Sequence, residues 1–538
     1  MKRYKMIVIF TVSFCFSMLE FPLSLYQNSS AAEKKPVRGG VYRRPLEFNP
    51  KTLDPALAVD IHAVTVIQQI FDGLVQFDKD LNVIPAIARS WRISPDGLSY
   101  TFFLKEGIEF HSGREVKAED FVYSFSRILD PETGSTSSDF FTRIDGAKEF
   151  MEKKAKEVKG LIAHDRYTLR IVLSEPYAPF ISILAMKGAK VVPKEEVTRP
   201  GMNFGRSPVG TGPFKFVSMK EGEEIVLEAN PGYFEGRPYL DRIIFKIFHG
   251  SPREEIFRRF KAGELEDSFI PFEEVEEVKK DKHYIFVQRP ILSLRFYGLN
   301  TRVDPLKKKE IRKAINLSIP KEEIGKDVLK GMAHLTDRII PLGMPAYSPG
   351  KVSFKHQLEK AREFLKQAGY PEGKGLPPIE FWSAAKSELA VKELERVRQD
   401  LSKIGITLNI QYETQWPKFQ ELLASKKAPM FMYAWYADFP DPDNFLGTLF
   451  HSRSKYNFTA YDHPEVDRLL DKARAERDYL KRMGMYRKIE EIVLEDAPIV
   501  PMVNHLLQLV YQPYVKGIEM SSLGGAYIPM KKIWLEKE

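Results

Sequence analysis

The stretch VKELERVRQDLSKIGITLNI, residues 391–410, joins a helical pattern to a strand-like pattern within one short segment. Gly405 ends the helical part, as glycine does after many helices, and Ile406 to Ile410 alternate in polarity as a strand does. A helix, a tight glycine turn and a strand make up half of an α/β layer, so this segment predicts an α/β fold. The helical part places apolar residues at three- and four-residue spacing: Val391, Leu394, Val397, Leu401 and Ile404.

Periodic segments on either side of this unit extend the α/β pattern. A helix is expected over residues 358–368, because Gly369 and Pro371 supply a glycine-then-proline stop. Another helix is expected to begin near Asp462, whose side chain can cap free amides, with Pro464 in its first turn. Two strands are expected where apolar residues alternate: Tyr100, Phe102 and Leu104, and then Tyr167, Leu169, Ile171 and Leu173.

The composition is that of a folded globular protein. The chain of 538 residues is long enough for several domains with sizeable cores. Hydrophobic residues make up 43% and charged residues 29%, which excludes wholesale disorder and fibrous structure. The formal net charge is +8, but bases and acids are interleaved, as in EEVEEVKKDK at residues 273–282. Nucleic-acid binding needs a clustered basic surface, so no nucleic-acid partner is expected.

Residues 1–32 have the pattern of an export signal. Basic residues from Lys2 to Lys5 precede an apolar run over residues 6–19, and the small residues 30–32 predict cleavage after Ala32. The apolar run is shorter than the roughly 20 residues that span a membrane, so a retained anchor is the weaker interpretation. The segment therefore predicts an exported protein.

Cys15 is the single cysteine, so no internal disulfide can form. It is a candidate for a lipid anchor, but Phe14 stands before it where such a signal has a small residue. We therefore expect a periplasmic protein, with lipid attachment at Cys15 as the less favoured alternative.

Common enzyme motifs are absent from the sequence. It has no G-x-S-x-G elbow, no H-E-x-x-H pair and no Walker loop. Ser452 and Lys455 satisfy S-x-x-K, a pattern that arises by chance in a chain of this length. The histidines are scattered, so no tight metal site and no cofactor are expected. These observations disfavour an enzyme, although a secreted hydrolase remains the alternative from a different class.

Residues 430–446 read MFMYAWYADFPDPDNFL and form the most distinctive segment. Met430 to Trp435 are typical of a buried strand, and Asp438 follows where prolines begin two turns, near a surface or cleft. A calcium loop is not expected there, because the prolines and the missing Gly and Glu break its ligand spacing.

The carboxylate of Asp438 has two interpretations. In the first, it caps turns together with Asp441, Asp443 and Asn444. In the second, it faces a cleft and pairs with a cation on a ligand, and aromatic residues line that cleft: Trp435, Tyr436 and Trp416.

Several ordered blocks resemble the extracytoplasmic solute-binding proteins of ABC importers, in the family 5 branch that carries oligopeptides, dipeptides and nickel. The resemblance spans nearly the whole mature chain. The blocks are Leu53-Asp54-Pro55, FDGL at residues 71–74, the segment from Pro85 to Asp130, PVGTGPF at residues 208–214, NPGYFEGRPY at residues 230–239, and residues 436–446.

This resemblance implies an α/β, two-lobed periplasmic-binding-protein clamp of the large three-domain class II type, with mixed sheets and a hinge of crossing strands. The ligand would be enclosed by hinge closure between the lobes. The crossing strands are expected near residues 291–297 and 504–511. The implied domains are residues 33–67 with 204–291 and 506–538 as domain I, 68–203 as domain II and 292–505 as domain III.

The resemblance also implies a peptide ligand and a site. Asp438 stands where peptide binders hold a carboxylate for the ligand's α-ammonium, and an enclosed ammonium must be paired. Ligand main chain would add like a strand, next to Asp60 and Ile61 on one lobe and Ala434 to Tyr436 on the other. The expected ligand-binding residues are therefore Asp438, Trp435, Tyr436, Ala434, Trp416, Asp60 and Ile61.

The resemblance leaves the ligand's length and exact class open. Met430, Phe431 and Met432 stand where some oligopeptide binders place an arginine for the ligand's carboxylate. A sugar, glutathione or metal chelate is the alternative load within the family. The expected partners are a peptide ligand and the transmembrane permease subunits of an ABC transporter, and the expected state is a monomer.

Overall fold

The computed structural model describes residues 35–349 and 355–536. The predicted signal peptide, its cleavage site after Ala32 and the lipid-anchor candidate Cys15 lie outside the described residues. Among the described residues, no helix is both long enough and apolar enough to cross a bilayer.

The helices are α1 (Ile61–Ile70), α2 (Ala118–Leu129), α3 (Ala147–Met151), α4 (Phe180–Ile183), α5 (Lys194–Val197), α6 (Arg253–Lys261), α7 (Val275–Val278), α8 (Lys309–Ser318), α9 (Lys321–Glu323), α10 (Leu358–Gln367), α11 (Glu388–Ser402), α12 (Trp416–Ala424), α13 (Asp443–Phe450), α14 (Pro464–Ala475) and α15 (Tyr479–Asp496).

A four-stranded mixed sheet begins the fold. Its order is β1-β10-β9-β8, with β1 (Val41–Leu46) parallel to β10 (Arg242–Ile247) and the other pairs antiparallel. β8 spans Phe214–Lys220 and β9 spans Glu224–Ala229. The sheet packs with α1 and C-terminal residues such as Ile533 around one hydrophobic core. Strands from distant parts of the chain therefore complete this sheet.

A second, antiparallel sheet has the order β4-β5-β7-β6. It contains both strands predicted from alternation, as β5 (Ser99–Leu104) and β7 (Thr168–Val172), together with β4 (Ala88–Ile93) and β6 (Leu161–Asp165). Alternate residues of β5 and the apolar face of α2 enter the same core. A two-stranded sheet of β2 (Val75–Phe77) and β3 (Val83–Pro85) lies before them in the chain.

The largest sheet contains, at one edge, the strand of the segment that first indicated an α/β fold. Its order is β11-β18-β13-β17-β15-β16, and the parallel strands β15 and β16 are joined through α11. Residues 391–410 predicted the helix α11 and the strand β16. β12 and β14 also pair with β18. The bounds are β11 Asp267–Phe269, β12 Ile285–Pro290, β13 Ser293–Leu299, β14 Ala333–Leu335, β15 Ile379–Ser383, β16 Leu408–Tyr412, β17 Met430–Tyr436 and β18 Ile499–Tyr511.

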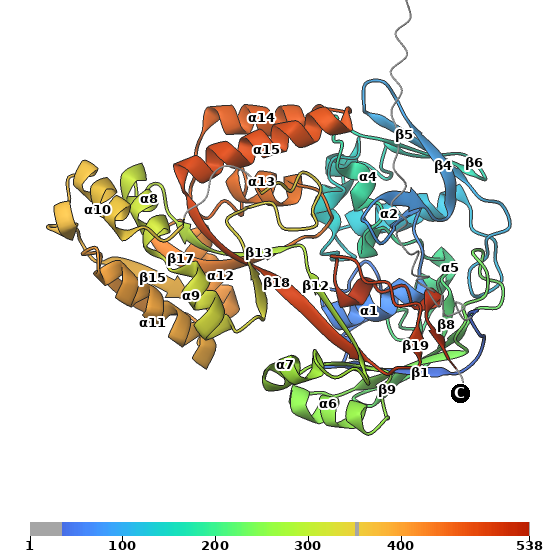
Figure 1. Ribbon diagram of the computed structural model, residues 1–538. Coiled ribbons are helices and arrows are strands. Elements are labelled where there is room, and N and C mark those ends of the chain that lie inside the picture. The colour runs from blue at the N-terminus through green and yellow to red at the C-terminus, as the bar shows by residue number, and fades with distance from the viewer. Residues whose placement is uncertain (1–34, 350–354, 537–538) are drawn as a thin grey trace, which may run out of the picture. The chain divides into compact units, whose positions relative to one another are not determined.

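β18 is the long crossing strand of this sheet (Figure 1). Its first half pairs with β13 and β14, and its second half pairs with β11 and β12. β13 and β18 overlap the two segments predicted to cross at the hinge, residues 291–297 and 504–511. The single strand β18 therefore connects the strands β13 and β14 to the strands β11 and β12. The C-terminal residues add a small pair, β19 (Val515–Lys516) with β20 (Trp534–Leu535).

The start of α14 differs from the prediction. The predicted cap, Asp462, instead pairs with Arg302 at 3.0 Å. His463 occupies the N-cap position, and its Nδ1 accepts from the Val466 amide at 3.4 Å. Pro464 lies in the first turn as predicted. The Asp462 carboxylate therefore binds Arg302, which is distant in the sequence, and does not cap the helix.

The predicted three-domain division stays a prediction. The hydrophobic cores nonetheless follow the sheets: one packs the β4–β7 sheet with α2, and two others pack opposite faces of the largest sheet with α8, α10, α11 and α13–α15.

Candidate functional site

β17 carries the candidate site, and one of its edges is open. On one side it pairs with β13 along its length, from Leu299 opposite Met430 to Ser293 opposite Tyr436. On the other side β15 pairs only with Met430 and Phe431. β17 therefore has an unpaired edge from residue 432 to residue 436, within the part of the chain that the structure describes.

The backbone groups of Ala434 and Tyr436 lie on this open edge. The Ala437 amide donates to the Leu292 carbonyl of β13 at 2.8 Å, and backbone groups of successive strand residues alternate between the two edges. Ala437 and Trp435 therefore face β13, and Ala434 and Tyr436 face away from it. Such an edge is a template for pairing with another extended chain.

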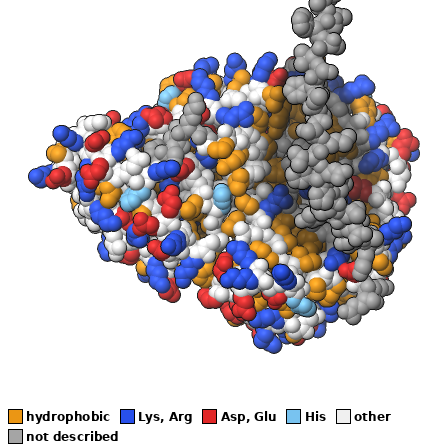
Figure 2. Space-filling view, viewed as in Figure 1, with side chains coloured by type: hydrophobic (Ala, Val, Ile, Leu, Met, Phe, Trp, Pro, Cys, Tyr) orange, Lys and Arg blue, Asp and Glu red, His pale blue; other side chains and the backbone are white. Residues whose placement is uncertain are grey.

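A large cavity of about 1200 Å³ lies against this part of β17. Trp416, Ala434 and Tyr436 line it, and so do Arg295 of β13 and His505 of β18, whereas Asp438 and Trp435, expected in the same cleft as Trp416 and Tyr436, line a different cavity. Trp416 is 53% exposed and stacks on Tyr433 with ring centroids 6.1 Å apart. Figure 2 shows hydrophobic side chains gathered in a hollow of the face in view, with acids and bases interleaved over the rest of that face.

His505 is a neutral histidine at the edge of this cavity. Its ring stacks on Tyr436 with centroids 5.2 Å apart, and its Nδ1 lies 3.2 Å from the Ser293 hydroxyl. Burial, and then the nearby charge of Arg295, lowers the pKa of His505 to about 4. Burial also raises the pKa of Tyr436, against the charge of Arg295.

We expect His505 to stay uncharged down to about pH 5. Its folded pKa of about 4 lies below the ordinary value of 6.5, so its contribution to stability is present above pH 6.5 and is lost as pH falls toward 4. Ring carbon chemical shifts of His505 should therefore move near pH 4, and a midpoint near 6.5 would contradict the burial argument. His505→Gln should remove this part of the acid destabilisation.

Asp438 lines a second cavity, of about 850 Å³, together with Trp435. Asn444 at the start of α13 positions both residues. Its Oδ1 accepts from the Asp438 amide at 3.0 Å and from Trp435 Nε1 at 3.1 Å, and its Nδ2 donates to Asp438 Oδ2 at 3.2 Å. Asp438 is half-buried, so a carboxylate oxygen remains accessible to a ligand.

The charge of one residue distant in the sequence, Lys187, acts on Asp438. Burial raises its pKa, while the Asn444 hydrogen bond and the charge of Lys187 oppose that rise. Lys187 binds the Ala58 carbonyl, and burial lowers its pKa against the charges of Asp438 and Asp60. Burial and then Asp438 raise the pKa of Tyr527 to about 12. The carboxylate therefore carries an electrostatic cost that a ligand cation would relieve.

The neighbouring acids do more than cap turns. Asp441 forms a buried ion pair with Arg482 of α15 at 2.7 Å, and Asp443 pairs with Arg474 of α14 at 2.8 Å. Asp443 also accepts from the Tyr177 hydroxyl at 2.9 Å. These bonds commit both carboxylates to packing, which leaves Asp438 as the acid of this segment that faces a cavity without an ion-pair partner among the described residues.

The structure changes the expectation for Asp60 and Ile61. Asp60 is extended, with φ −100° and ψ 154°, and its Oδ1 caps α1 by accepting from the Ala63 amide at 2.7 Å. Ile61 is 55% exposed but is the first residue of α1. The extended backbone therefore ends at Asp60, because the cap turns the chain into a helix, and the predicted pairing of ligand main chain next to Asp60 and Ile61 stays a prediction. Asp60 and Asp438 both lie near Lys187, because the negative charge of each one raises the pKa of Lys187.

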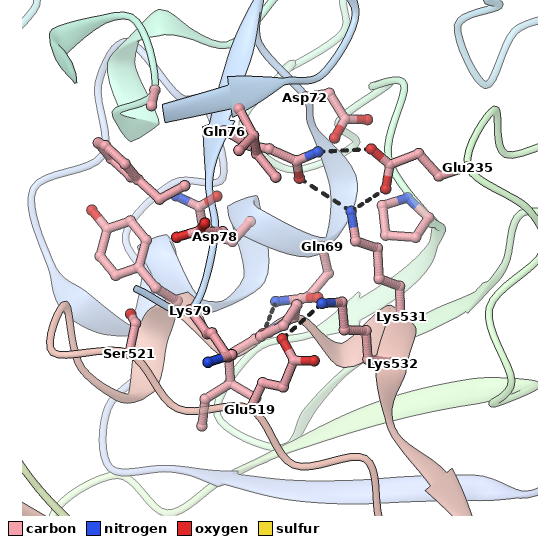
Figure 3. A pocket seen from close by; sticks show the side chains of 18 of the residues that line it. Gln69, Asp72, Gln76, Asp78, Lys79, Glu235, Glu519, Ser521, Lys531 and Lys532 are labelled. Atoms are coloured by element: carbon pink, nitrogen blue, oxygen red, sulfur yellow. Dashed lines mark hydrogen bonds and ion pairs between the residues drawn. The ribbon is translucent and has the colours of Figure 1, made fainter. Parts of the chain in front are cut away.

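A third cavity, of about 330 Å³, lies beside the C-terminal half of α1. Four of its charged groups form two ion pairs: Lys531 lies 2.6 Å from Glu235, with Gln76 bridging both, and Lys532 lies 2.7 Å from Glu519 (Figure 3). A ligand there would have to displace these pairs. We therefore place the candidate site at the two larger cavities.

The structure does not join Ser452 and Lys455 into a catalytic pair. The Ser452 hydroxyl donates to Asp467, and Lys455 pairs with Asp139 at 2.7 Å. A nucleophilic serine needs a base within hydrogen-bond reach, and Lys455 is committed elsewhere. Among the described residues, no group of three or more His, Cys, Asp or Glu side chains is arranged to hold a metal ion.

Sequence reasoning missed several residues around the site. Lys187, Tyr527, Arg295 and His505 lie far from Asp438 in the sequence, and no local pattern signals their approach. Asn444 lies within the distinctive segment of residues 430–446. Its side-chain amide, close in sequence to the Asp438 carboxylate at the strand end, was the signal that could have identified it.

An open strand edge between two cavities, with a half-buried carboxylate beyond its end, defines a protein that encloses a small ligand within a two-lobed α/β clamp. The chain belongs to the bacterial extracellular solute-binding proteins, family 5, whose model (described as the family's Middle part) matches residues 82–457. The fold expected from the sequence is thereby confirmed.

The relatives bind different loads. Heme-binding protein A of Haemophilus influenzae is 28% identical over 504 residues, which cover 90% of this chain and 89% of that protein. Probable di/tripeptide-binding protein 5 of Pseudomonas aeruginosa is 27% identical over 536 residues, covering 95% and 97%. The solved structure of the periplasmic binding protein DppA from Helicobacter pylori, in complex with peptide STSA, has a TM-score of 0.74 and 29% identity, covering 93% of this chain and 99% of that one.

Proposed function

We propose that this protein is a receptor that captures short peptides outside the cytoplasmic membrane and delivers them to an ABC-transporter permease. The proposal rests on the combination of the Asp438 carboxylate and the open edge of β17 at Ala434 and Tyr436. The carboxylate would bind an ammonium group, and the strand edge would bind peptide main chain. A di/tripeptide-binding relative and a peptide-bound solved structure support the same ligand class.

Asp438 would hold the peptide's α-ammonium. A charge-assisted hydrogen bond supplies the partner that an enclosed ammonium needs, and Asn444 fixes the carboxylate in place beforehand. Lys187 is the nearby protein cation, but its own bond goes to the Ala58 carbonyl. The ligand cation would therefore add to this arrangement without displacing it.

The peptide main chain would extend the sheet at the free edge of β17. Main-chain hydrogen bonds are the same for every sequence, so they bind peptides in general. The 850 Å³ cavity beside Asp438 would receive a side chain, and water in a cavity of that size allows residues of different size. Hinge closure around β13 and β18 would then cover the ligand.

The proposal includes export and the absence of turnover. The family is extracellular, and residues 1–32 have the export pattern, with mature protein starting at Glu33 in the periplasm as a monomer. The separated hydrogen bonds of Ser452 and Lys455 support binding without hydrolysis.

Native mass spectrometry of gently isolated protein should detect bound peptides, and added peptides should be recovered intact after long incubation. Hemin, glutathione or a sugar as the retained molecule, with no peptide, would overturn the peptide assignment. Cleavage that survives rigorous purification and disappears in a Ser452→Ala variant would overturn the receptor assignment. The variant lacking Ser452 otherwise serves as the matched control for unchanged retention.

A further inference from the structure

Lys190 places a buried ammonium in the wall of the 330 Å³ cavity without an acceptor for it. The residue is 6% exposed, and its Nζ makes no hydrogen bond and no ion pair with the part of the chain that the structure describes. Burial lowers the pKa of Lys190 to about 8; the charge of Asp72 opposes this shift, and the charge of Lys531 adds to it. Asp72 and Lys531 line the same cavity. Buried polar groups normally have hydrogen-bond partners, so an acceptor for this ammonium is missing.

The other cations that line this cavity have partners. Lys531 and Lys532 form the two ion pairs described above (Figure 3). The Lys79 side chain is 61% exposed and pairs with Asp80 at 3.0 Å. A ligand in the space of these pairs would have to displace them. Lys190 belongs to none of the pairs, so a small molecule can bind it and leave them intact.

Asp72 is a buried acid of the same cavity, and it has no ion pair with any described residue. The hydroxyl groups of Tyr233 and Thr211 donate to its carboxylate, each at 3.3 Å. Hydroxyl donors usually lie within about 3.0 Å of their acceptor, so both hydrogen bonds are long. Burial raises the pKa of Asp72, and the charges of Lys531 and Lys190 oppose that rise. The carboxylate therefore has the capacity to accept from a further donor.

A molecule that carries both charges matches Lys190 and Asp72 together. An anion would leave the Asp72 carboxylate without a further donor, and a cation would leave the Lys190 ammonium unpaired. A zwitterion offers its carboxylate to Lys190 and its ammonium to Asp72, each through a charge-assisted hydrogen bond. An α-amino acid carries these two groups on one carbon atom.

The size and lining of the cavity favour a small ligand. Its volume of about 330 Å³ lies near the lower end of the roughly 300–1,000 Å³ that small-molecule sites occupy. Apolar side chains form part of the wall, which suits an apolar side chain on the ligand. They include Phe77, Ile84, Ala185 and Leu523.

We propose that this cavity binds a free α-amino acid with a small apolar side chain, whose carboxylate meets Lys190 and whose ammonium meets Asp72. The site is separate from the one proposed for peptides, because the cavity shares no lining residue with either larger cavity. It adds a second binding site to the proposed receptor, and it does not depend on the identity of the ligand in the larger cavities.

Calorimetry with L-alanine, L-valine and L-leucine tests this site. We expect one or more of them to bind the unaltered protein. Each is compared with two analogues that lack one charge; for L-valine these are 3-methylbutyrate, without the ammonium, and isobutylamine, without the carboxylate. Each analogue should bind about 10- to 100-fold more weakly than its amino acid, the range for a charge-assisted hydrogen bond.

Variants locate the binding. Lys190→Met should weaken the amino acid about 10- to 100-fold and bring it close to the affinity of the matching amine, because groups in contact couple. Asp72→Asn should bring it close to the matching carboxylic acid for the same reason. Lys79→Met is the matched control and should keep full affinity, because Lys79 lines the same cavity but is exposed and paired. Asp438→Asn should keep it too, which separates this site from the one proposed for the peptide ammonium.

Several results would overturn this inference while leaving the peptide function untouched. If none of the three amino acids binds at millimolar concentration, the cavity holds water alone. Unchanged affinity in Lys190→Met, or lost affinity in Asp438→Asn, would place the amino acid elsewhere. Equal binding of an amino acid and its carboxylic acid analogue would refute the role of Asp72. Affinities describe the folded fraction, so partial unfolding of a variant does not mimic a weaker site.

Discussion

Replacing Asp438 by asparagine is expected to weaken the binding of short peptides by about 100-fold or more. Breaking a buried charge pair costs about 3–5 kcal/mol, because the partner ammonium is left enclosed without its counter-charge. Asparagine keeps the shape of the side chain and can still accept from Asn444, so the change removes the charge with little else. Calorimetry with a peptide and with its N-acetylated form measures the effect.

The combination of variant and modified peptide identifies the contact. Acetylation should cost a similar amount in the unaltered protein and much less in Asp438→Asn, because groups in contact couple. Asp139→Asn is the matched control, since Asp139 lines the same cavity but is 66% exposed and paired with Lys455. If acetylated and free peptides bind the unaltered protein equally well, Asp438 serves only to shape the turn.

Replacing Arg338 by methionine is expected to destabilise the protein by about 3–5 kcal/mol. Arg338 forms an ion pair with Glu490 of α15, and the two side chains are 4% and 0% exposed. Glu490 also accepts from the amides of Ile339 and Ile340 at 2.7 and 2.8 Å. Without Arg338, the Glu490 carboxylate is buried in a hydrophobic core with only those amides to stabilise it. Urea unfolding measures the loss.

One further variant and one pH series test the cause. Arg302→Met breaks an exposed pair, 62% and 54% exposed, and should cost less than about 1 kcal/mol. Burial already raises the pKa of Glu490, so protonation removes the buried charge and the deficit of Arg338→Met should shrink as the pH falls. Equal losses in Arg338→Met and Arg302→Met would show that burial of the pair does not set its contribution.

Much of the local structure followed from residue spacing. The alternation of β5 and β7 and the helical spacing in α10 and α11 report which face of each element is buried, and the continuous apolar run of β17 reports a strand that is buried on both faces. That information lies within a few neighbouring residues. The position of Asp438 at the end of a buried strand could be predicted for the same reason. The family blocks supplied the order in which these elements assemble.

Helix starts and the surroundings of Asp438 could not be predicted in this way. Asp462 was expected to cap α14, but Arg302, far away in the chain, takes its carboxylate. Ile61 was expected next to the ligand main chain, and the sequence did not indicate that the Asp60 cap places it in α1. A side chain's partner depends on which group approaches it after packing, and spacing along the chain does not encode that approach.

Spacing and composition were enough for the α/β class, the buried strand of residues 430–435 and a candidate carboxylate after it, because each depends on contacts between near neighbours. The open edge at Ala434 and Tyr436 exists only because β15 pairs with β17 at two positions and then diverges. Arg295 meets the cavity only because β13 lies beside β17 in one register. Pairing between strands distant in the sequence is a property of the folded chain, and that pairing brings the residues of the site together.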